Sequence, residues 1–249
     1  MHERRLEAGE GRAVRMRRRL KRWLRAANAR RLRLTFVPPN YLFRARFRPG
    51  DAVVDVGTGD DPDLSRYLMA HYRVEAFAVD PTRKHAQALR ALAQSQPRFH
   101  YLPYALGARA GEVTFYESAV NVSGSLLAGH RNVRSDPVVT YTVPVVTLAG
   151  LLDMVGRSRV ALIKLDLEGA EFELIQSLDL SVLRRADQLL IEFHHETVAG
   201  ITRHDMERAV DRIRSTGMRA RVFNGRDCLF YWDPLVSGIG RLLGRPAPP

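Results

Sequence analysis

Short apolar runs alternate with amphipathic stretches along most of the chain. The apolar runs predict strands over residues 51–57, 74–80, 99–106, 160–167 and 188–195. Apolar residues at helical spacing predict helices over residues 64–71, 82–94, 170–178 and 203–216. Two shorter strands are expected over 112–117 and 139–146, around a polar loop at 118–136. This alternation is typical of an α/β fold with a doubly wound, mostly parallel sheet.

The last part of the predicted domain follows a different pattern. Residues 219–223 and 228–232 alternate as strands, and Asn224-Gly225 between them is a turn signal. An antiparallel C-terminal hairpin is therefore expected at one edge of the parallel sheet.

The positive charge of the chain is concentrated at its start. Residues 1–33 hold 13 Lys and Arg against 3 Asp and Glu, whereas the remaining residues hold 26 against 24. Apolar residues recur at helical spacing in this segment and would form an apolar stripe along one face of a helix. They are Met16, Leu20, Trp23, Leu24 and Ala27. We therefore predict a basic helical N-terminal arm over residues 1–40, a domain over 41–234 and a short tail over 235–249.

The role of the arm stays open between several interpretations. Its apolar stripe is expected to dock on the domain, or else residues 1–35 contact an anionic membrane surface, an acidic carrier protein or nucleic acid. Nucleic acid is the weaker interpretation, because the body is nearly neutral and Trp23 is the arm's single aromatic residue for base stacking.

Composition narrows the class of protein. The length of 249 residues suits one α/β domain with an appendage. No apolar run approaches the roughly 18–20 residues of a membrane span, and the arginine-rich start lacks the apolar core of a signal peptide. The single cysteine, Cys228, excludes an intramolecular disulfide, so a cytoplasmic location is expected.

The predicted strand at 160–167 carries unusual charges. Lys164, Asp166 and Glu168 follow one another at spacing two, so they are expected to share one face. Unpaired charges are costly on a buried strand. Since ligands bind at the carboxyl ends of strands in open α/β sheets, these side chains predict a site there.

A second signal lies at the end of the first strand. Gly57-Thr58-Gly59 forms a G-x-G turn, which is typical of nucleotide binding. Asp60 and Asp61 replace the rest of the dinucleotide motif and would repel a pyrophosphate, but they tolerate a sulfonium and an amino group. Asp80 ends the second strand at the spacing of a ribose-binding acid. The turn therefore favours S-adenosylmethionine over NAD, the alternative being an ordinary glycine turn with capping aspartates.

Several sequence blocks resemble a known family. These blocks are DVGTGDD at 55–61, Asp80-Pro81, YALG at 104–107, NVSGSLL at 121–127, VPVVTL at 143–148, IKLDLEGAEFELI at 163–175 and LLIEFHHE at 189–196. Together they resemble the FkbM-type S-adenosylmethionine-dependent methyltransferases over roughly residues 50–232. DVGTGDDPD departs from the family's usual DVGANIG.

The resemblance implies a Rossmann-like class I methyltransferase fold and O-methylation of a small molecule such as a sugar, glycolipid or natural product. The residues expected to bind S-adenosylmethionine are Asp55, Gly57, Thr58, Gly59, Asp80, Pro81, Ala105, Leu106 and Asp166. The residues expected to contact the hydroxylated acceptor are Ser123, Ser125, Glu168 and His194.

Methyl transfer to an alcohol requires that the hydroxyl proton leave. His194 is the candidate base, and Glu192 is expected on the same face of its strand, where it would orient the imidazole or stabilise its charge. His195 is expected to face the other side in a structural role. Lys164 and Asp166 complete the predicted catalytic set, with Lys164 either pairing with Asp166 or orienting the acceptor.

The same side chains suggest a metal. Asp166, Glu192 and His194, with Glu168 nearby, are expected on two adjacent strands and would offer ligands to Mg²⁺. In the competing interpretation Lys164 neutralises Asp166, and Glu168 caps the following helix.

Three functions remain open from the sequence. The leading hypothesis is a small-molecule O-methyltransferase. The second is an RNA methyltransferase that uses the basic arm. The third is a non-catalytic binding module on the same fold, a hypothesis that rests on the altered glycine turn.

Overall fold

The computed structural model describes residues 33–37, 41–131 and 136–232, together with Met16, Leu20, Trp23, Leu24 and Ala27. The chain divides into two compact units, residues 1–45 and 46–249. In the first unit, β1 (Thr35–Val37) pairs antiparallel with β2 (Tyr41–Phe43). The five single residues of the arm are helical and exposed. The remainder of the predicted arm helix and the tail at 235–249 lie outside the described residues.

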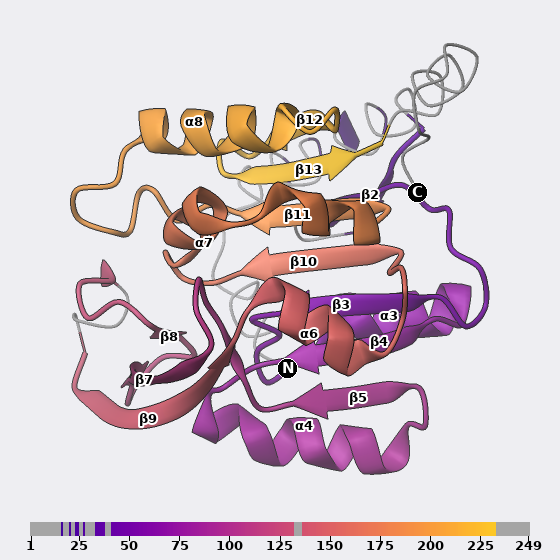
Figure 1. Ribbon diagram of the computed structural model, residues 1–249. Coiled ribbons are helices and arrows are strands. Elements are labelled where there is room, and N and C mark those ends of the chain that lie inside the picture. The colour runs from indigo at the N-terminus through magenta and orange to yellow at the C-terminus, as the bar shows by residue number, and fades with distance from the viewer. Residues whose placement is uncertain are drawn as a thin grey trace. The chain divides into compact units, whose positions relative to one another are not determined.

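The second unit is built on a sheet of seven strands (Figure 1). Its order is β12-β13-β11-β10-β3-β4-β5. The strands are β3 (Ala52–Val56), β4 (Glu75–Val79), β5 (Phe99–Leu102), β10 (Leu162–Asp166), β11 (Gln188–Glu192), β12 (Arg219–Phe223) and β13 (Asp227–Tyr231). Strands β5, β4, β3, β10 and β11 run parallel, whereas β13 and β12 run antiparallel to their neighbours. The predicted doubly wound, mostly parallel sheet is confirmed.

Helices cover both faces of this sheet. They are α3 (Asp63–Tyr72), α4 (Arg83–Ser95), α6 (Leu148–Val155), α7 (Glu171–Ser177), α8 (Arg203–Arg214) and the 3₁₀ helix η2 (Leu180–Arg185). From β3 the chain steps to β4 and β5 in one direction and reaches β10 and β11 in the other. Right-handed crossovers in opposite directions place their helices on opposite faces, and Figure 1 shows α7 in front of the sheet and α3 behind it.

The main core explains why the strands are apolar along their length. Every residue of β3 is buried, as a central parallel strand requires. Leu151 and Leu152 of α6, Leu174 of α7 and Ile213 of α8 pack with the strands in one hydrophobic cluster. Among the described residues, the structure contains no helix whose length and hydropathy would let it cross a bilayer.

The predicted third strand, residues 99–106, is wrong in one respect. It breaks into β5 and the short β6 (Ala105–Leu106), which belong to different sheets. Pro103 stands between them and has no N–H to donate to a ladder, so the strand cannot continue through it.

A second sheet of four strands lies at the carboxyl ends of the parallel strands (Figure 1). Its order is β6-β9-β7-β8, with β7 (Gly111–Ser118), β8 (Gly124–Ser125) and β9 (Val138–Val146). Phe115, Tyr141, Val143 and Val145 form its small core. The two strands predicted around a polar loop are confirmed, and this loop is carried to the edge of the main sheet where β3, β10 and β11 end.

Candidate active site

The glycine turn after β3 lies directly against the end of β10. Gly57 has φ +72°, and a Cβ atom added to it would stand 1.8 Å from the main-chain oxygen of Asp166. Its N–H donates to the carbonyl of Val79 at the end of β4. The turn predicted to hold the cofactor therefore joins the ends of three strands, and only glycine fits its first position.

Asp80 fixes the other side of this turn. The residue is 3% exposed. Its Oδ2 accepts from the N–H of Gly59 at 2.8 Å and lies 3.2 Å from Nδ1 of His85, while Oδ1 accepts from the N–H of Thr82 at 2.8 Å. That a ribose hydroxyl binds to this carboxylate stays a prediction. Burial acts to raise the pKa of Asp80, but His85 and Thr82 outweigh it and hold that pKa below its ordinary value.

Acid is expected to destabilise the wild-type protein more than an Asp80→Asn variant. A carboxyl whose pKa is lower in the folded chain stabilises the fold fully above its ordinary pKa of 3.8, and this stabilisation is lost as the pH falls through the folded value. Urea unfolding at about pH 7 and about pH 3 measures the difference in unfolding free energy. An equal loss of unfolding free energy in the wild type and in the variant would contradict the lowered pKa of Asp80.

Lys164 is buried in the middle of β10 among acids. Its Nζ lies 3.1 Å from Oδ2 of Asp166, 3.7 Å from Oδ1 of Asp55 and 3.4 Å from the carbonyl of Gly57. The expected pair between Lys164 and Asp166 is thus present. Burial raises the pKa of Asp55. Burial also acts to raise the pKa of Asp166, but Lys164 and His194 outweigh it and lower that pKa.

His194 follows β11 immediately and is 5% exposed. The main-chain N–H of His194 donates to Oε1 of Glu171 at 2.5 Å, and Nδ1 of its ring lies 3.3 Å from the same oxygen. Glu171 is fully buried at the start of α7, where its Oε2 also accepts from the N–H of Gly169 at 2.9 Å. The group that orients the imidazole is therefore Glu171. The sequence had pointed to Glu192, whose Oε1 lies 3.8 Å from Nε2 and 2.8 Å from Arg226.

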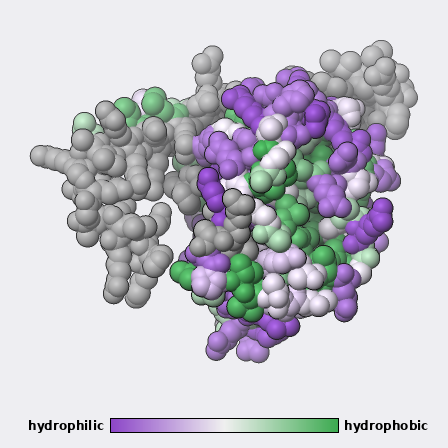
Figure 2. All heavy atoms as spheres, turned by 90° about the vertical axis from the view of Figure 1, so that its left-hand side faces the viewer, coloured by the Kyte–Doolittle hydropathy of each residue, from purple (hydrophilic) through white to green (hydrophobic). Residues whose placement is uncertain are grey.

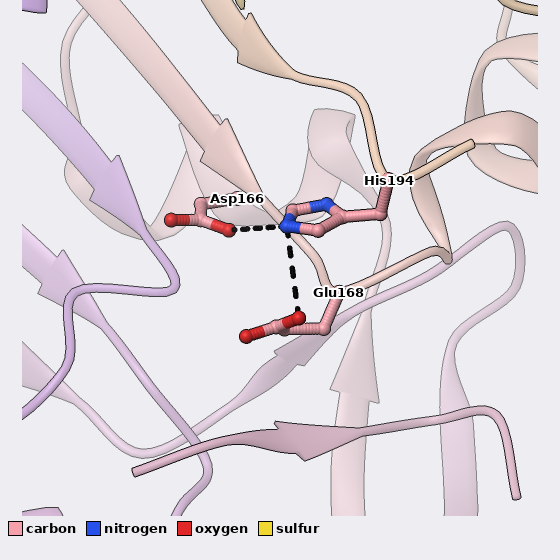
Figure 3. A group of neighbouring side chains, drawn as sticks. All are labelled: Asp166, Glu168 and His194. Carbon is pink, nitrogen blue, oxygen red and sulfur yellow. Dashed lines mark ion pairs between the residues drawn. The ribbon is translucent and has the colours of Figure 1, made fainter. Parts of the chain in front are cut away.

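The Nε2 atom of His194 faces two carboxylates from the end of β10 (Figure 3). Asp166 Oδ1 lies at 3.5 Å and Glu168 Oε2 at 3.6 Å. Burial acts to lower the pKa of His194, but the hydrogen bond and charge of Glu171, with Asp166 and Glu168, raise it to about 10. In the ligand-free protein the imidazole therefore keeps its proton at neutral pH, and its role as base stays a prediction.

Glu192 is the second candidate for proton transfer. It ends β11 directly beside Asp166 in the parallel register and remains 19% exposed at its side chain. Burial, followed by the charge of Asp166, raises the pKa of Glu192 to about 7. A carboxyl poised near neutral pH suits a general base.

Glu168 lies beyond the end of β10 in the left-handed region, with φ +48°. Its carbonyl accepts from the hydroxyl of Ser125 at 2.8 Å. The expectation that Glu168 caps the following helix is wrong, because the N-cap residue of α7 is Ala170 and no side chain caps the helix. The left-handed backbone turns the Glu168 side chain toward His194 instead (Figure 3).

Sequence reasoning missed His130 as well as Glu171. His130 is fully buried, and its Nε2 lies 2.8 Å from Oγ1 of Thr197 and 3.0 Å from Oε2 of Glu168. Its ring lies edge-on to that of His194. Glu171 had a local signal, since it stands three residues after Glu168 in the same charged block. His130 had none, because its approach depends on the folding of a loop far away in sequence.

Hydrogen bonds within the polar loop after β7, and from α4, hold this loop in place. Lys84 donates to the carbonyls of Ser118 and Asn121 at 2.6 and 2.5 Å, and thereby joins the loop to α4. Ser123 and Ser125 are buried, and the Ser125 hydroxyl also accepts from the N–H of Leu127. The structure thus places Ser125 next to Glu168, at the edge of the cluster.

The remaining predicted cofactor residues lie around the strand ends. Thr58 is buried and donates its hydroxyl to the carbonyl of Asp55. Pro81 is half-buried after β4. Ala105 and Leu106 are buried in β6, on opposite sides of the boundary between the two hydrophobic cores.

A sequence comparison identifies the family. Residues 55–217 match the methyltransferase FkbM domain, and this range includes the glycine turn, the charged block of β10 and the end of β11. The chain belongs to the FkbM methyltransferase family. It is therefore a methyltransferase that uses S-adenosylmethionine, as the sequence blocks predict. No curated protein sequence matches the chain significantly.

Solved structures that resemble this chain are remote in sequence. Fibrillarin from Methanococcus jannaschii, a pre-rRNA processing protein, is 7% identical with a TM-score of 0.45, covering 80% of this chain and 70% of that one. Fibrillarin from Aeropyrum pernix, solved with bound S-adenosyl-L-methionine, is 9% identical with a TM-score of 0.41, covering 74% and 66%. Precorrin-6y C5,15-methyltransferase from Geobacter metallireducens is 13% identical with a TM-score of 0.41, covering 76% and 83%.

Proposed function

We propose that this FkbM methyltransferase transfers the methyl group of S-adenosylmethionine to a hydroxyl oxygen of a small molecule. The observation that carries the proposal is the position of Glu192 and His194 at the strand ends next to the glycine turn. An aliphatic hydroxyl is a weak nucleophile at neutral pH, so a group that receives its proton is needed close to the methyl donor. Glu192, whose pKa burial and the charge of Asp166 raise to about 7, offers such a group directly, whereas His194 offers one in its neutral form.

The cofactor is proposed to bind along the turn after β3. Gly59, with nothing within 4 Å of its Cβ position, would let ligand atoms approach the main chain, and Asp80 beside it would accept from the ribose hydroxyls. Because Gly57 touches the main chain of Asp166, a cofactor on this turn would hold its methyl group near the cluster at the end of β10. The hydrogen bond from the hydroxyl of Thr58 to the carbonyl of Asp55 would hold the turn in place.

The acceptor is proposed to enter over the loop after β7. Val120 and Val122 expose 74% and 63% of their surface on this loop, while Ser123 and Ser125 line its buried side. Figure 2 looks onto the same edge of the molecule and shows hydrophobic and neutral surface in the middle of a hydrophilic rim. A small molecule with an apolar part and a hydroxyl group suits such a surface.

The reaction balances without a redox step. The acceptor oxygen attacks the methyl carbon in line, the carbon–sulfur bond breaks, and S-adenosylhomocysteine leaves as a neutral thioether. The hydroxyl proton passes to the carboxylate of Glu192, or to His194 in its neutral form. Positioning of the two substrates supplies much of the remaining acceleration.

The test uses S-adenosylmethionine with a radioactive methyl group and a panel of sugars, glycolipids and hydroxylated natural products. We expect label in an O-methyl ether of at least one acceptor. An Asp80→Asn variant, which weakens the proposed cofactor site, serves as control for background transfer. Transfer of label exclusively to amines, carbon atoms or RNA would contradict O-methylation.

A further inference from the structure

Three ligand atoms converge beside the glycine turn. One oxygen of Asp166, one oxygen of Glu168 and Nε2 of His194 all lie within 4.8 Å of one another. Figure 3 shows these three side chains turned toward one another. We propose that these three side chains bind one divalent transition-metal cation of the Mn²⁺ type. Binding of the cation stands on the geometry alone, whereas its use in catalysis rests on the proposed O-methylation.

The distances suit a single ion. Nε2 of His194 lies 3.5 Å from Oδ1 of Asp166 and 3.6 Å from Oε2 of Glu168. Ligand atoms held by one cation at about 2.1 Å are roughly 3–4 Å apart in octahedral geometry. The three side chains therefore need to move by less than about 1 Å to share an ion.

The histidine is directed into this space and has no hydrogen bond there. His194 is 5% exposed, and among the described residues no hydrogen bond to its Nε2 is found. The nearby Oε2 of Glu168 is a buried atom whose close polar neighbours among the described residues are Nε2 of His130 at 3.0 Å and Nε2 of His194 at 3.6 Å. Because buried charges are paired or bound to metals, a cation would balance the negative charge of the two carboxylates that meet here.

The surroundings have the features that support metal ligands. Glu171 holds the Nδ1 side of His194, so Nε2 is the atom presented to the cluster. A carboxylate on the far nitrogen of a histidine is the usual support of a metal-bound imidazole. Lys164 pairs with Oδ2 of Asp166 and leaves Oδ1 toward the site. Glu192, expected among the ligands from the sequence, is instead paired with Arg226 at 2.8 Å.

The donor set points to the class of cation. Mg²⁺ and Ca²⁺ prefer oxygen ligands alone, whereas imidazole suits transition metals. Two carboxylates and one imidazole therefore favour Mn²⁺ over the Mg²⁺ expected from the sequence. An acceptor hydroxyl on such an ion would lose its proton more readily, because the cation stabilises the alkoxide.

Electron paramagnetic resonance of Mn²⁺ tests the proposal on the full chain without cofactor or acceptor. The signal of free Mn²⁺ is expected to decrease to a plateau at one ion per chain. Glu168→Gln, which removes one ligand at a partly exposed side chain, is expected to weaken binding by at least about tenfold. Glu207→Gln on exposed α8 is the matched control and is expected to bind as the wild type does. Melting temperatures confirm that both variants are folded.

Three results would overturn the proposal. They are an unchanged Mn²⁺ signal on addition of wild-type protein, equal affinity in the Glu168→Gln and Glu207→Gln variants, and displacement of Mn²⁺ by an equal concentration of Mg²⁺, which would deny the imidazole a role. Two measurements, Mn²⁺ binding and O-methylation, distinguish failure of the proposed metal site from failure of the proposed function. O-methylation that persists in a chelator without Mn²⁺ binding rejects the cation alone, whereas Mn²⁺ binding without O-methylation of any acceptor rejects the function alone.

Discussion

A His194→Gln variant is expected to transfer methyl groups about 10²–10⁴-fold more slowly than the wild type, with unchanged affinity for S-adenosylhomocysteine. The imidazole faces Asp166 and Glu168 through Nε2, at the strand ends where the acceptor is proposed to lose its proton. The cofactor turn follows β3, which β10 separates from β11 in the sheet, and its contacts are made through Gly57 and Asp80 instead. Steady-state turnover and calorimetric titration measure the two quantities separately.

His195→Gln is the matched control for this prediction. His195 is also buried, but the nearest acid to its Nε2 is the exposed Glu196 at 4.0 Å. The same substitution one residue away is therefore expected to leave turnover close to the wild-type value. Normal turnover in His194→Gln, or an equal loss in both variants, would reject a catalytic role for His194.

A Gly57→Ala variant is expected to lose about 2–5 kcal/mol of unfolding free energy and roughly 5–15 °C in melting temperature. Two costs add at this position. The backbone has φ +72°, which a side chain disfavours, and the new Cβ would stand 1.8 Å from the main-chain oxygen of Asp166. Relief of that contact would move the cofactor turn away from β10, so weaker binding of S-adenosylhomocysteine is expected as well.

Gly59→Ala separates these two costs. Gly59 has φ +73°, but nothing lies within 4 Å of the Cβ position. The substitution is therefore expected to cost only the backbone strain, about 1–2 kcal/mol. Thermal and urea unfolding of the two variants measure the difference. A Gly57→Ala variant as stable as Gly59→Ala would show that the turn does not press against β10 as described.

The sequence predicted much of the fold because the strands of the main sheet are buried along their length. The apolar runs of β3 and β10, and the Asn224-Gly225 turn, are local signals that the packing leaves unchanged. The pair of Lys164 and Asp166 was also predictable, since both stand on one face of one strand.

The parts that the sequence did not show depend on main-chain geometry and on distant contacts. Pro103 moves β6 into a second sheet, and the left-handed backbone of Glu168 turns its side chain toward His194. His130 reaches Glu168 from a separate loop. Strand periodicity continues neither through a proline nor past a residue with positive φ, so the composition of the cluster followed only from the structure.

Titration of S-adenosylhomocysteine into the wild type and the Asp80→Asn variant tests most directly whether the cofactor occupies the turn beside the cluster. We predict binding at one site in the wild type and no binding of NAD⁺. In the variant, binding is expected to weaken by about 10- to 100-fold, because a hydrogen bond to a charged acceptor contributes roughly 1.5–3 kcal/mol. Equal affinity in both proteins, or no binding to the wild type, would contradict the account.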